Sequence, residues 1–381
     1  MVRKKILMTA TVPSMIGQFN INNLILLQKL GYEVEIACNL KDRSIWNEDR
    51  VLAFVQQMKD MHIAIHQIDF PRKPYDVKRL LHARKQMQQL FREKHYDGVH
   101  CHTPVAAMIS RLVAHKWKAK VVYTAHGFHF FKGAPKLNWI IFFPMEQMLS
   151  RWTDVLITIN QEDYLLAKKC FHAKSVEYVQ GVGIDVDQFS NRNGERSSIR
   201  KSIGLNENEV ALLSVGELSP RKNHVQILQA IADMKLPYVH YFIVGKGALQ
   251  EQLTQTAEKL HIEKQLTFLG YRTDIPDLLH AADVFVFPSK QEGLPVALME
   301  AIAAGVPCLA SEIRGNVDLK DYGVEYFALD NQEILDEKLR KMVQNIHDGA
   351  GVLISKKGNL EDLDVHSIDK SMRRIYRVFD A

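Results

Sequence analysis

The sequence predicts an α/β protein with two doubly wound domains, each built on a parallel sheet with helices on both faces. Short apolar runs of strand length alternate with helix-length segments along most of the chain, as in parallel strands joined by crossover helices. At 381 residues the chain exceeds what one hydrophobic core usually serves, so two or three domains are expected. A polar stretch at 190–198, SNRNGERSS, separates two series of apolar runs and is the best linker candidate.

The candidate strands are short apolar runs, several of which end at Gly, Pro or polar residues. The first series has seven of them, at 4–10, 33–39, 63–70, 97–104, 119–127, 154–160 and 175–183. The second series has five, at 210–217, 239–247, 266–272, 282–289 and 306–313. We therefore expect an amino-terminal domain over 1–188 and a carboxy-terminal domain over 189–365, which face a central cleft. Ligands of such sheets bind beyond the carboxyl ends of the strands. The closing residues, 366–381, have a helical pattern.

Composition and cysteine content indicate a globular protein of a reducing compartment. The net charge is +5 at pH 7, and no apolar stretch approaches the ~20 residues that a membrane-spanning helix needs. The four cysteines (Cys38, Cys101, Cys170 and Cys308) are scattered and suggest neither a disulfide framework nor a zinc motif. A cytoplasmic location is therefore expected.

The most basic stretch, 72–95, contains eight Lys or Arg residues and two acidic ones. Leu80, Met87, Leu90 and Phe91 recur within it at helical spacing, with the basic residues around them. One interpretation is an amphipathic helix that lies on an anionic membrane. The other is a surface helix that packs on the core and happens to be basic. Nucleic acid is not expected as a partner, because no recognition motif or aromatic stacking pattern accompanies the charge.

The most informative segment is PSKQEGLPVALMEAIAAGVP at 288–307. It predicts a loop that carries Glu292, followed by a helix with Pro295 in its first turn. Unpaired amides at a helix N-terminus form an anion site, whereas a carboxylate accepts two hydrogen bonds from a diol. Glu292 and Glu300 beside such a site indicate a ligand with phosphate and hydroxyl groups, such as a nucleotide-sugar. The simpler alternative is an ordinary strand–helix unit with a solvated glutamate at each end.

This segment resembles the EGxPxxxxEAxAxGxP signature of the family-4 retaining glycosyltransferases, which have the GT-B fold of two Rossmann-like domains. The resemblance implies that Glu292 holds hydroxyls of the donor sugar and that Glu300 holds the ribose diol of the nucleotide. It also assigns Gly293 and Leu294 to the donor-binding loop. In this family the closing helix, here 366–381, crosses back onto the amino-terminal domain.

A second segment, VGELSPRKNH at 215–224, carries Arg221 and Lys222 after a strand and before a helix. Cations at this position would face the diphosphate and stabilise the leaving nucleoside diphosphate as the glycosidic bond breaks. Related glycosyltransferases usually have an arginine directly after the glycine, but here Glu217 follows Gly216. Lys222 is in the register of the family. Arg221 either supplies the missing charge or is a surface residue.

A third segment, YTAHGFHFFKGAP at 123–135, resembles the AHGFHF segment of bacterial exopolysaccharide and capsule glycosyltransferases. His126 follows a strand, so its imidazole would project into the cleft, and the resemblance places this histidine beside the donor sugar. The continuation over 138–169 resembles the same subgroup. A purely structural role for a histidine at a strand end is the alternative.

Near the amino terminus, ATVPSMIGQFN places Gly17 in a loop between the first strand and a helix. A glycine there lets the backbone approach a phosphate or an acceptor closely. We therefore count Gly17 among the donor-binding candidates.

Three other motifs are interpreted as structural. Asp185 and Asp187 match a DxD metal motif, but they lie in GVGIDVDQF, which resembles the turn that closes the first domain in this family. The His-Cys-His run at 100–102 has metal-ligating residue types, yet it lacks a further ligand cluster and is interpreted as a strand-end loop on the acceptor side. The Gly-Lys-Gly run at 245–247 is a weak phosphate-loop signal and is interpreted as a tight turn near the nucleotide.

Together these features predict a retaining glycosyltransferase that moves a sugar from a UDP-sugar to a lipid-linked acceptor in exopolysaccharide synthesis. The first sugar expected is an N-acetylhexosamine. The catalytic candidates are His126, Lys222 and Glu292. No cofactor or metal is expected, since Lys222 and a helix N-terminus can balance the diphosphate. We expect the enzyme on the cytoplasmic face of the membrane, with residues 72–95 on anionic lipid and a polysaccharide-synthesis complex as a further partner.

Two other functions stay open on the sequence alone. One is a UDP-sugar epimerase or hydrolase on the same fold, which needs no sugar acceptor. The other is a catalytically silent protein that binds a nucleotide-sugar and acts as a scaffold in a polysaccharide assembly complex. The missing arginine after Gly216 favours the scaffold.

Overall fold

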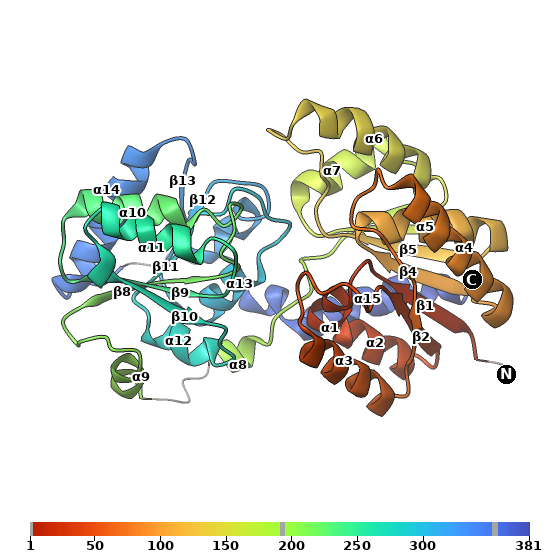
Figure 1. Cartoon of the computed structure of the whole chain (residues 1–381), viewed down its shortest axis with the longest axis horizontal. Coiled ribbons are helices and arrows are strands. Elements are labelled where there is room, and N and C mark those ends of the chain that lie inside the picture. Colours follow the sequence, from red (N-terminus) through yellow and green to blue (C-terminus); the bar gives the residue numbers. More distant parts are fainter. Residues whose placement is uncertain (1–2, 191–194, 353–356) are drawn as a thin grey trace. The chain divides into compact units, whose positions relative to one another are not determined.

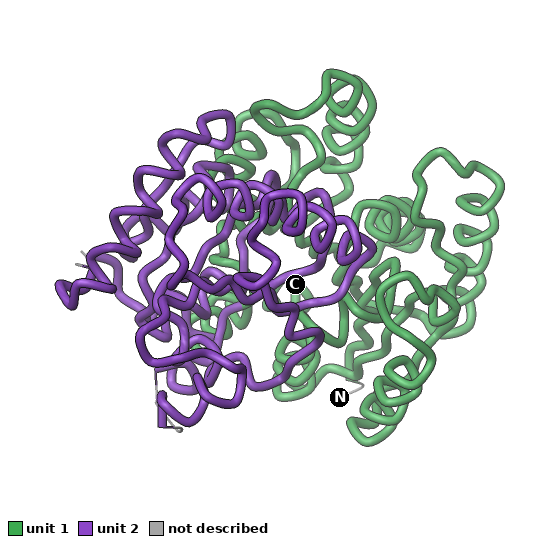
Figure 2. The backbone as a smooth tube through the Cα atoms, turned by 60° about the vertical axis from the view of Figure 1, so that its left-hand side comes forward, with its two compact units in different colours: residues 1–182, 366–381 green, residues 183–365 purple. Residues whose placement is uncertain are grey.

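The computed structural model describes residues 3–190, 195–352 and 357–381. The chain divides into two compact units, which Figure 2 shows in separate colours. Unit 1 comprises Met1–Val182 and His366–Ala381, and unit 2 comprises Gly183–Val365. Unit 2 is therefore one continuous segment, whereas unit 1 is assembled from both ends of the chain.

The polar linker candidate at 190–198 is described only in part. Residues 191–194 lie outside the described residues, and Arg196–Ser202 form a helix, α9. The division between the units lies earlier, after Val182, and the sequence had suggested a boundary after residue 188.

Unit 1 is built on a sheet of seven parallel strands in the order β3-β2-β1-β4-β5-β6-β7 (Figure 1). Each strand lies within one of the seven apolar runs of the first series. Their bounds are β1 Lys5–Thr9, β2 Glu33–Cys38, β3 Ala64–Gln67, β4 Gly98–His102, β5 Lys120–Ala125, β6 Val155–Thr158 and β7 Ser175–Tyr178.

Helices cover both faces of this sheet, because successive strand residues point to opposite sides. Leu7 packs on one face with α4 to α7, whereas Ile6 and Met8 pack on the other with α1 to α3 and α15. The helix bounds are α1 Pro13–Phe19, α2 Ile21–Lys29, α3 Glu48–Asp60, α4 Val77–Lys94, α5 Pro104–Trp117, α6 Lys136–Ser150, α7 Gln161–Cys170 and α15 Val365–Tyr376.

Unit 2 has a six-stranded parallel sheet in the order β10-β9-β8-β11-β12-β13. Numbered within the unit, this is the 3-2-1-4-5-6 order of dinucleotide-binding folds, and unit 1 repeats it with one further strand. The bounds are β8 Val210–Val215, β9 Val239–Val244, β10 Leu266–Gly270, β11 Val284–Phe287, β12 Cys308–Ser311 and β13 Val324–Phe327. Five of these strands were predicted, and β13 was not.

The helices of unit 2 also lie on both sides of its sheet (Figure 1). Helices α10, α11 and α14 share one apolar core with the strands, and α9 packs against α12 on the other side. The bounds are α8 Val186–Ser190, α9 Arg196–Ser202, α10 His224–Met234, α11 Gln250–Lys259, α12 Ile275–Ala281, α13 Val296–Ala303 and α14 Gln332–His347.

The closing helix α15 and the residues after it belong to the core of unit 1. Ile368, Met372 and Ile375 are buried there on the helix face predicted from the sequence. Phe379 is 2% exposed, and a Cβ atom at Gly98 of β4 would lie only 2.4 Å from its ring. The absence of a side chain at Gly98 therefore leaves room for the ring of Phe379. Tyr32 Oη also donates to Asp380 Oδ1 at 2.8 Å.

The basic segment 72–95 forms α4, and its predicted apolar face is used inside unit 1. Met87, Leu90 and Phe91 are buried in the core, and Leu80 packs against it. The interpretation of this face as a membrane-binding surface is therefore wrong, because its apolar side chains already contact α5 and the sheet rather than facing outward. Over the described ranges, no helix combines the length and apolarity needed to cross a bilayer.

Candidate active site

The strand order of the unit 2 sheet reverses between β8 and β11, and two predicted motifs meet at that point. In doubly wound sheets, ligands bind at such a reversal, beyond the carboxyl ends of the strands. The loop after β8 carries Lys222, and the loop after β11 carries Glu292. The backbone N–H of Lys290 donates to the carbonyl of Arg221 at 2.8 Å, which ties the two loops together. Segments 70 residues apart in sequence thus form one site.

Lys222 and Glu292 form a partly buried ion pair. Lys222 Nζ donates to Glu292 Oε1 at 2.8 Å, and Arg221 Nη1 donates to the same oxygen at 2.9 Å. Within the described part of the chain, Glu292 Oε2 accepts no hydrogen bond. One carboxylate oxygen therefore holds two cations, while the other is left for a ligand group.

The environment of Lys222 is apolar on one side. Its ammonium lies 4.4 Å from the centroid of the Phe287 ring, at the end of β11. Burial lowers the pKa of Lys222, and the Glu292 carboxylate opposes that shift. Desolvation also strengthens the interaction of this cation with any anion that enters the site.

Arg221 places a guanidinium beside Lys222, although the position after Gly216 is Glu217. The Arg221 side chain is 44% exposed, against 11% for Lys222, so solvent screens it more strongly. The arginine expected from related sequences is thus absent from position 217, and an arginine four residues later lies on the same carboxylate.

Two glycines allow these loops to pack closely. A Cβ atom at Gly216 would lie 2.8 Å from Lys222 Cε, so the missing side chain makes room for the lysine. Gly245 has φ +148°, and a Cβ atom there would lie 1.8 Å from the carbonyl oxygen of Gly216. The Gly-Lys-Gly run at 245–247 is therefore a tight turn against the β8 loop, as predicted.

The helix after Glu292, α13, starts at Val296 with Pro295 as its N-cap residue. Pro295 provides no side-chain cap, and no described side chain accepts from the first amides of this helix, so they stay available to an anion. Glu300 lies in this helix, is partly buried, and accepts no side-chain hydrogen bond from the described residues. Burial raises the pKa of Glu300 to about 7. Hydroxyl donors stabilise the ionised form of a partly buried carboxylate that has no other hydrogen-bond donor.

The two other donor-loop candidates have packing roles. Gly293 presents its carbonyl oxygen to Gly315, where a Cβ atom would lie only 2.2 Å away. Gly315 has φ +83°, which also favours glycine. Leu294 is buried. These contacts fix the loop that carries Glu292.

In unit 1, three histidines lie side by side: His100 and His102 are fully buried, and His126 is half-buried. His100 Nδ1 lies 3.0 Å from Tyr376 Oη of α15, and its Nε2 lies 2.9 Å from Thr124 Oγ1. His102 Nδ1 lies 3.0 Å from His126 Nε2. Burial lowers the pKa of His100 to about 3 and that of His126 to about 4, and it lowers the pKa of His102 well below its usual value. All three imidazoles are therefore neutral near pH 7.

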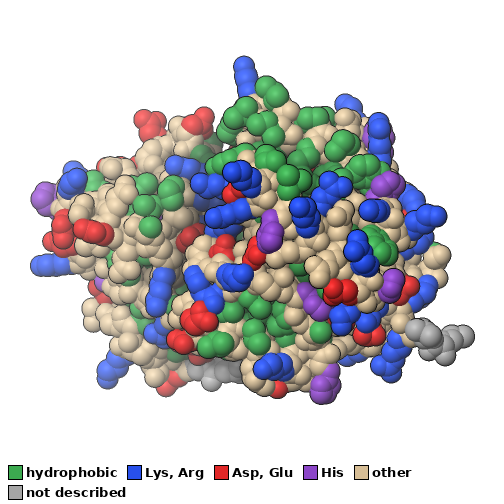
Figure 3. Space-filling model, turned by 45° about the vertical axis from the view of Figure 1, so that its right-hand side comes forward, with side chains coloured by type: hydrophobic (Ala, Val, Ile, Leu, Met, Phe, Trp, Pro, Cys, Tyr) green, Lys and Arg blue, Asp and Glu red, His purple; other side chains and the backbone are tan. Residues whose placement is uncertain are grey.

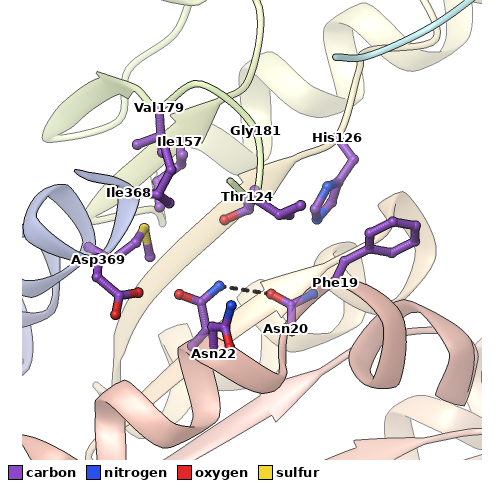
Figure 4. A pocket seen from close by; sticks show the side chains of 13 residues that line it. Phe19, Asn20, Asn22, Thr124, His126, Ile157, Val179, Gly181, Ile368 and Asp369 are labelled. Atoms are coloured by element: carbon purple, nitrogen blue, oxygen red, sulfur yellow. Dashed lines mark hydrogen bonds between the residues drawn. The ribbon is translucent and has the colours of Figure 1, made fainter. Parts of the chain in front are cut away.

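His126 borders a small cavity of about 20 Å³, shown in Figure 4. Asn20 and Thr124 line it beside His126, and Ile368 and Asp369 of α15 contribute further lining residues. The ring of His126 points toward the side chain of Thr124 in this view. The sequence singled out His126 here, but it gave no reason to select Thr124 or α15.

A larger apolar groove of about 260 Å³ lies at the reversal point of the unit 1 sheet, between β1 and β4. Thr11 and Thr103, which follow these two strands, line it, and their hydroxyls are 2.8 Å apart. Thr103 has φ +63°, a strained conformation for a β-branched residue. The remaining lining is mostly apolar and includes Arg72: Val12, Met15, Ile45, Arg72, Pro74, Pro104, Val105, Met108, His129, Phe142 and Met145.

The loop position predicted for Gly17 is wrong. Gly17 lies inside helix α1, and a Cβ atom there would be 2.4 Å from Trp46 and 3.0 Å from Phe54. The missing side chain therefore allows α1 to pack against an aromatic pair.

The His-Cys-His run at 100–102 is also placed differently from the prediction, because it forms part of strand β4 and is fully buried. Alternation along the strand puts His100 and His102 on the same face, with ring centroids 4.1 Å apart. Asp185 Oδ1 accepts from the backbone N–H of Gln188 at the start of α8, a helix-start contact that fits the turn interpretation. Among the described residues, no three or more His, Cys, Asp or Glu side chains are arranged so that they could hold a metal ion.

Two family models match the chain, one over each unit. The model described as Glycosyltransferase Family 4 matches residues 23–179, and the model described as Glycosyl transferases group 1 matches residues 195–347. The chain is 34% identical to the glycosyltransferase EpsD of Bacillus subtilis over 323 aligned residues. This alignment covers 83% of this chain and 81% of that protein. It is also 30% identical to the UDP-Gal:alpha-D-GlcNAc-diphosphoundecaprenol alpha-1,3-galactosyltransferase of Escherichia coli, over 71% of each chain.

Solved structures share the whole architecture at lower identity. HepE of Anabaena, solved with UDP and glucose, superposes with a TM-score of 0.78 at 19% identity over 98% of this chain and 99% of that one. WaaG, a glycosyltransferase of lipopolysaccharide biosynthesis, superposes with a TM-score of 0.71 at 18% identity over 97% and 99% of the two chains. The chain therefore belongs to the family-4 glycosyltransferases and has their GT-B fold of two Rossmann-like units.

Proposed function

We propose that this glycosyltransferase moves a hexose from a UDP-sugar to a lipid-linked acceptor during exopolysaccharide synthesis, with retention of anomeric configuration. The observation that carries the proposal is the Lys222–Glu292 pair at the strand reversal of unit 2. Support for the nucleotide comes from the Escherichia coli relative, which is named for UDP-Gal, and from HepE, which was solved with UDP and with UDP-glucose. An N-acetylhexosamine remains the first sugar to test.

Different site residues bind different parts of the donor. Lys222 and Arg221 face the diphosphate, and the uncapped start of α13 adds amide donors to the same anion. Glu292 Oε2 accepts hydroxyls of the sugar, and Glu300 accepts the ribose diol. As the bond between the anomeric carbon and the diphosphate oxygen breaks, the cations stabilise the negative charge on departing UDP. These groups require no metal.

The acceptor is assigned to unit 1. Its groove at the β1–β4 reversal is mainly apolar but contains Arg72, which suits a phosphate linked to a long hydrocarbon chain. The Escherichia coli relative is named for a diphosphoundecaprenol acceptor of this chemistry. His126 is neutral, so it can exchange hydrogen bonds with sugar hydroxyls without carrying charge.

The test is sugar transfer by Lys222→Ala with EDTA present throughout. We expect a loss of about 10²–10³-fold in kcat/KM, because one stabilising donor of the leaving group is removed. Lys259→Ala on the exposed surface of α11 is the matched control and should transfer normally. Arg221→Ala should lose less, since its side chain is more exposed.

Because Lys222→Ala leaves Glu292 without its buried partner, the double variant Lys222→Ala/Glu292→Gln separates stability from chemistry. Its thermal stability should recover while transfer stays low. Normal transfer by Lys222→Ala would contradict the proposed leaving-group role. Consumption of UDP-sugar without any acceptor would indicate an epimerase or hydrolase, and donor binding without transfer to any lipid-linked acceptor would indicate a scaffold.

A further inference from the structure

Helix α6 (Lys136–Ser150) is apolar around nearly its whole circumference although it lies on the surface of unit 1. Its sequence, KLNWIIFFPMEQMLS, has one acidic and one basic side chain. Surface helices normally have a polar outer face, and a helix that is apolar all round is normally buried in protein or lipid. The outer side of α6 therefore requires a partner other than water.

The inner side of α6 accounts for only part of its apolar residues. Trp139, Phe142 and Phe143 pack against the core of unit 1, and Leu149 is fully buried. The outer side chains stay exposed: 63% for Leu137, 70% for Ile140, 48% for Ile141 and 48% for Met148, with Pro144 exposed among them. We call these five residues the α6 outer face. Their spacing of three and four residues makes one continuous stripe.

The exposed charged side chains that flank α6 along the chain are positive, and the nearby Glu162 accepts from the backbone N–H of Lys132. Lys132 and Lys136 lie exposed at its amino end, and Arg151 follows its carboxyl end. The single acidic residue of the helix, Glu146, is buried and binds Arg111 at 2.8 Å. Figure 3 shows hydrophobic side chains gathered on the upper part of one face of the protein, with Lys and Arg side chains along their border. In Figure 1, α6 lies at the top of unit 1.

We propose that the α6 outer face inserts into the interfacial layer of an anionic lipid bilayer, with Lys132, Lys136 and Arg151 on the lipid headgroups. A helix of 15 residues is too short to span a bilayer, and an apolar stripe bordered by cations is typical of helices that lie in the interface. Anionic headgroups complement the three cations. A second copy of the chain does not, because a two-fold contact through this face would bring like charges together.

The same helix also reaches the acceptor groove. Phe142 and Met145 of α6 line that groove, and Met145 follows Ile141 of the α6 outer face by one helical turn, so the groove borders this face. Insertion of α6 would thus place the groove next to the bilayer that contains the acceptor lipid. This role rests on the proposed function. The membrane contact itself rests only on the exposed stripe and its charges.

The experiment is co-sedimentation of the full chain with vesicles of phosphatidylcholine, with and without phosphatidylglycerol, at low and high salt. We expect binding to the anionic vesicles that weakens as salt rises. Ile140→Asp should lower the partition coefficient about tenfold or more, because it replaces an inserted side chain with a charge. Leu52→Asp is the matched control, since Leu52 of α3 is 58% exposed and lies away from α6; it should bind like the wild type.

Three results would overturn the inference: no binding to anionic vesicles, equal binding by Ile140→Asp, or a dimer in size-exclusion chromatography that Ile140→Asp dissociates. Thermal stabilisation by UDP is measured on the same samples and depends on unit 2. If UDP stabilises the protein but the protein does not bind vesicles, the membrane contact is refuted and the donor assignment stays intact. Loss of UDP stabilisation with normal vesicle binding would refute the donor assignment and leave the membrane contact intact.

Discussion

Glu292 and Glu300, the two carboxylates of the proposed donor site, have different electrostatic environments. Glu292 lies between two cations at 2.8 and 2.9 Å, and its charge is balanced before any ligand arrives. Glu300 has no such partner among the described residues, and burial raises its pKa to about 7. The first carboxylate is therefore preorganised, whereas the second depends on solvent pH and on the ligand.

This difference predicts a pH dependence of donor binding. We propose that the ionised form of Glu300 accepts both ribose hydroxyls, so UDP-glucose should bind more tightly at pH 8 than at pH 6, by up to about tenfold. The diphosphate of UDP-glucose is a diester and does not titrate in this range. Isothermal titration calorimetry of the wild type and Glu300→Gln measures the effect.

The glutamine variant should show a flat profile between these pH values, and Glu258→Gln, an exposed change on α11, should keep the slope. An unchanged slope in Glu300→Gln would contradict the assignment. The sign for stability is opposite. The unfolded carboxyl ionises near 4.5, so the unligated protein should lose stability as pH rises from about 4.5 to about 7.

Single residues were predictable only where they belong to a long motif. Glu292, Glu300 and Lys222 could be selected because the surrounding pattern fixes a strand, a loop and a helix start. His102 could not, because its contact with His126 depends on the pairing of β4 with β5, which no local pattern contains. The strained conformation of Thr103 was invisible for the same reason.

Elements were predictable where an apolar run is continuous. Twelve strands fit this description and were found. Strand β13 has a mixed burial pattern in Val324–Phe327, with Glu325 exposed, so it gives no such run. It lies at the edge of the unit 2 sheet, where only one neighbouring strand supports it. For helix α4 the element was predictable but its surroundings were not. An amphipathic pattern does not say whether the apolar face contacts lipid or protein.

Helix α1 gives a prediction at this scale. Gly17→Val should lower the free energy of unfolding by roughly 1–3 kcal/mol, because its side chain would overlap the Trp46 ring. Chemical denaturation measures this loss. Gln18→Val, at an exposed neighbouring position of α1, controls for the poorer helix propensity of valine.

The affinity of Gly17→Val for UDP-glucose should equal that of the wild type, since we propose that the donor binds in unit 2. A variant with normal stability and weakened donor binding would instead support Gly17 as a donor-site residue.

The two ends of the chain meet in unit 1, because the chain returns to this unit after it has completed unit 2. Residues 366–381 complete the core of unit 1, and Lys4 Nζ donates to the carbonyl of Phe379 at 2.8 Å. The parallel sheets and the division into two such domains could be expected from the sequence, because alternating strands and helices leave few topologies. The docking of the last helix followed from family resemblance, since its apolar face would suit either unit.

Phe379→Ala tests this crossing. We expect a loss of about 3–5 kcal/mol in the stability of unit 1, because a buried aromatic side chain is removed beside Gly98. Hydrogen exchange should accelerate in β1 and β4 while β8 and β11 keep their protection. The exposed change Arg377→Ala is the control. Equal acceleration in both sheets would show that the two units unfold together.

The interrupted chain path of unit 1 has a consequence for synthesis on the ribosome. Its strands emerge first, yet the residues that fill the space at Gly98 are the last to be translated. Unit 2 is uninterrupted, so its own core does not depend on the last residues of the chain. The earlier-made unit must therefore wait with part of its core unfilled until translation ends, and a nascent chain at that stage is a substrate for chaperones. Stop codons close to the 3′ end of the gene would damage the half of the protein that was made first.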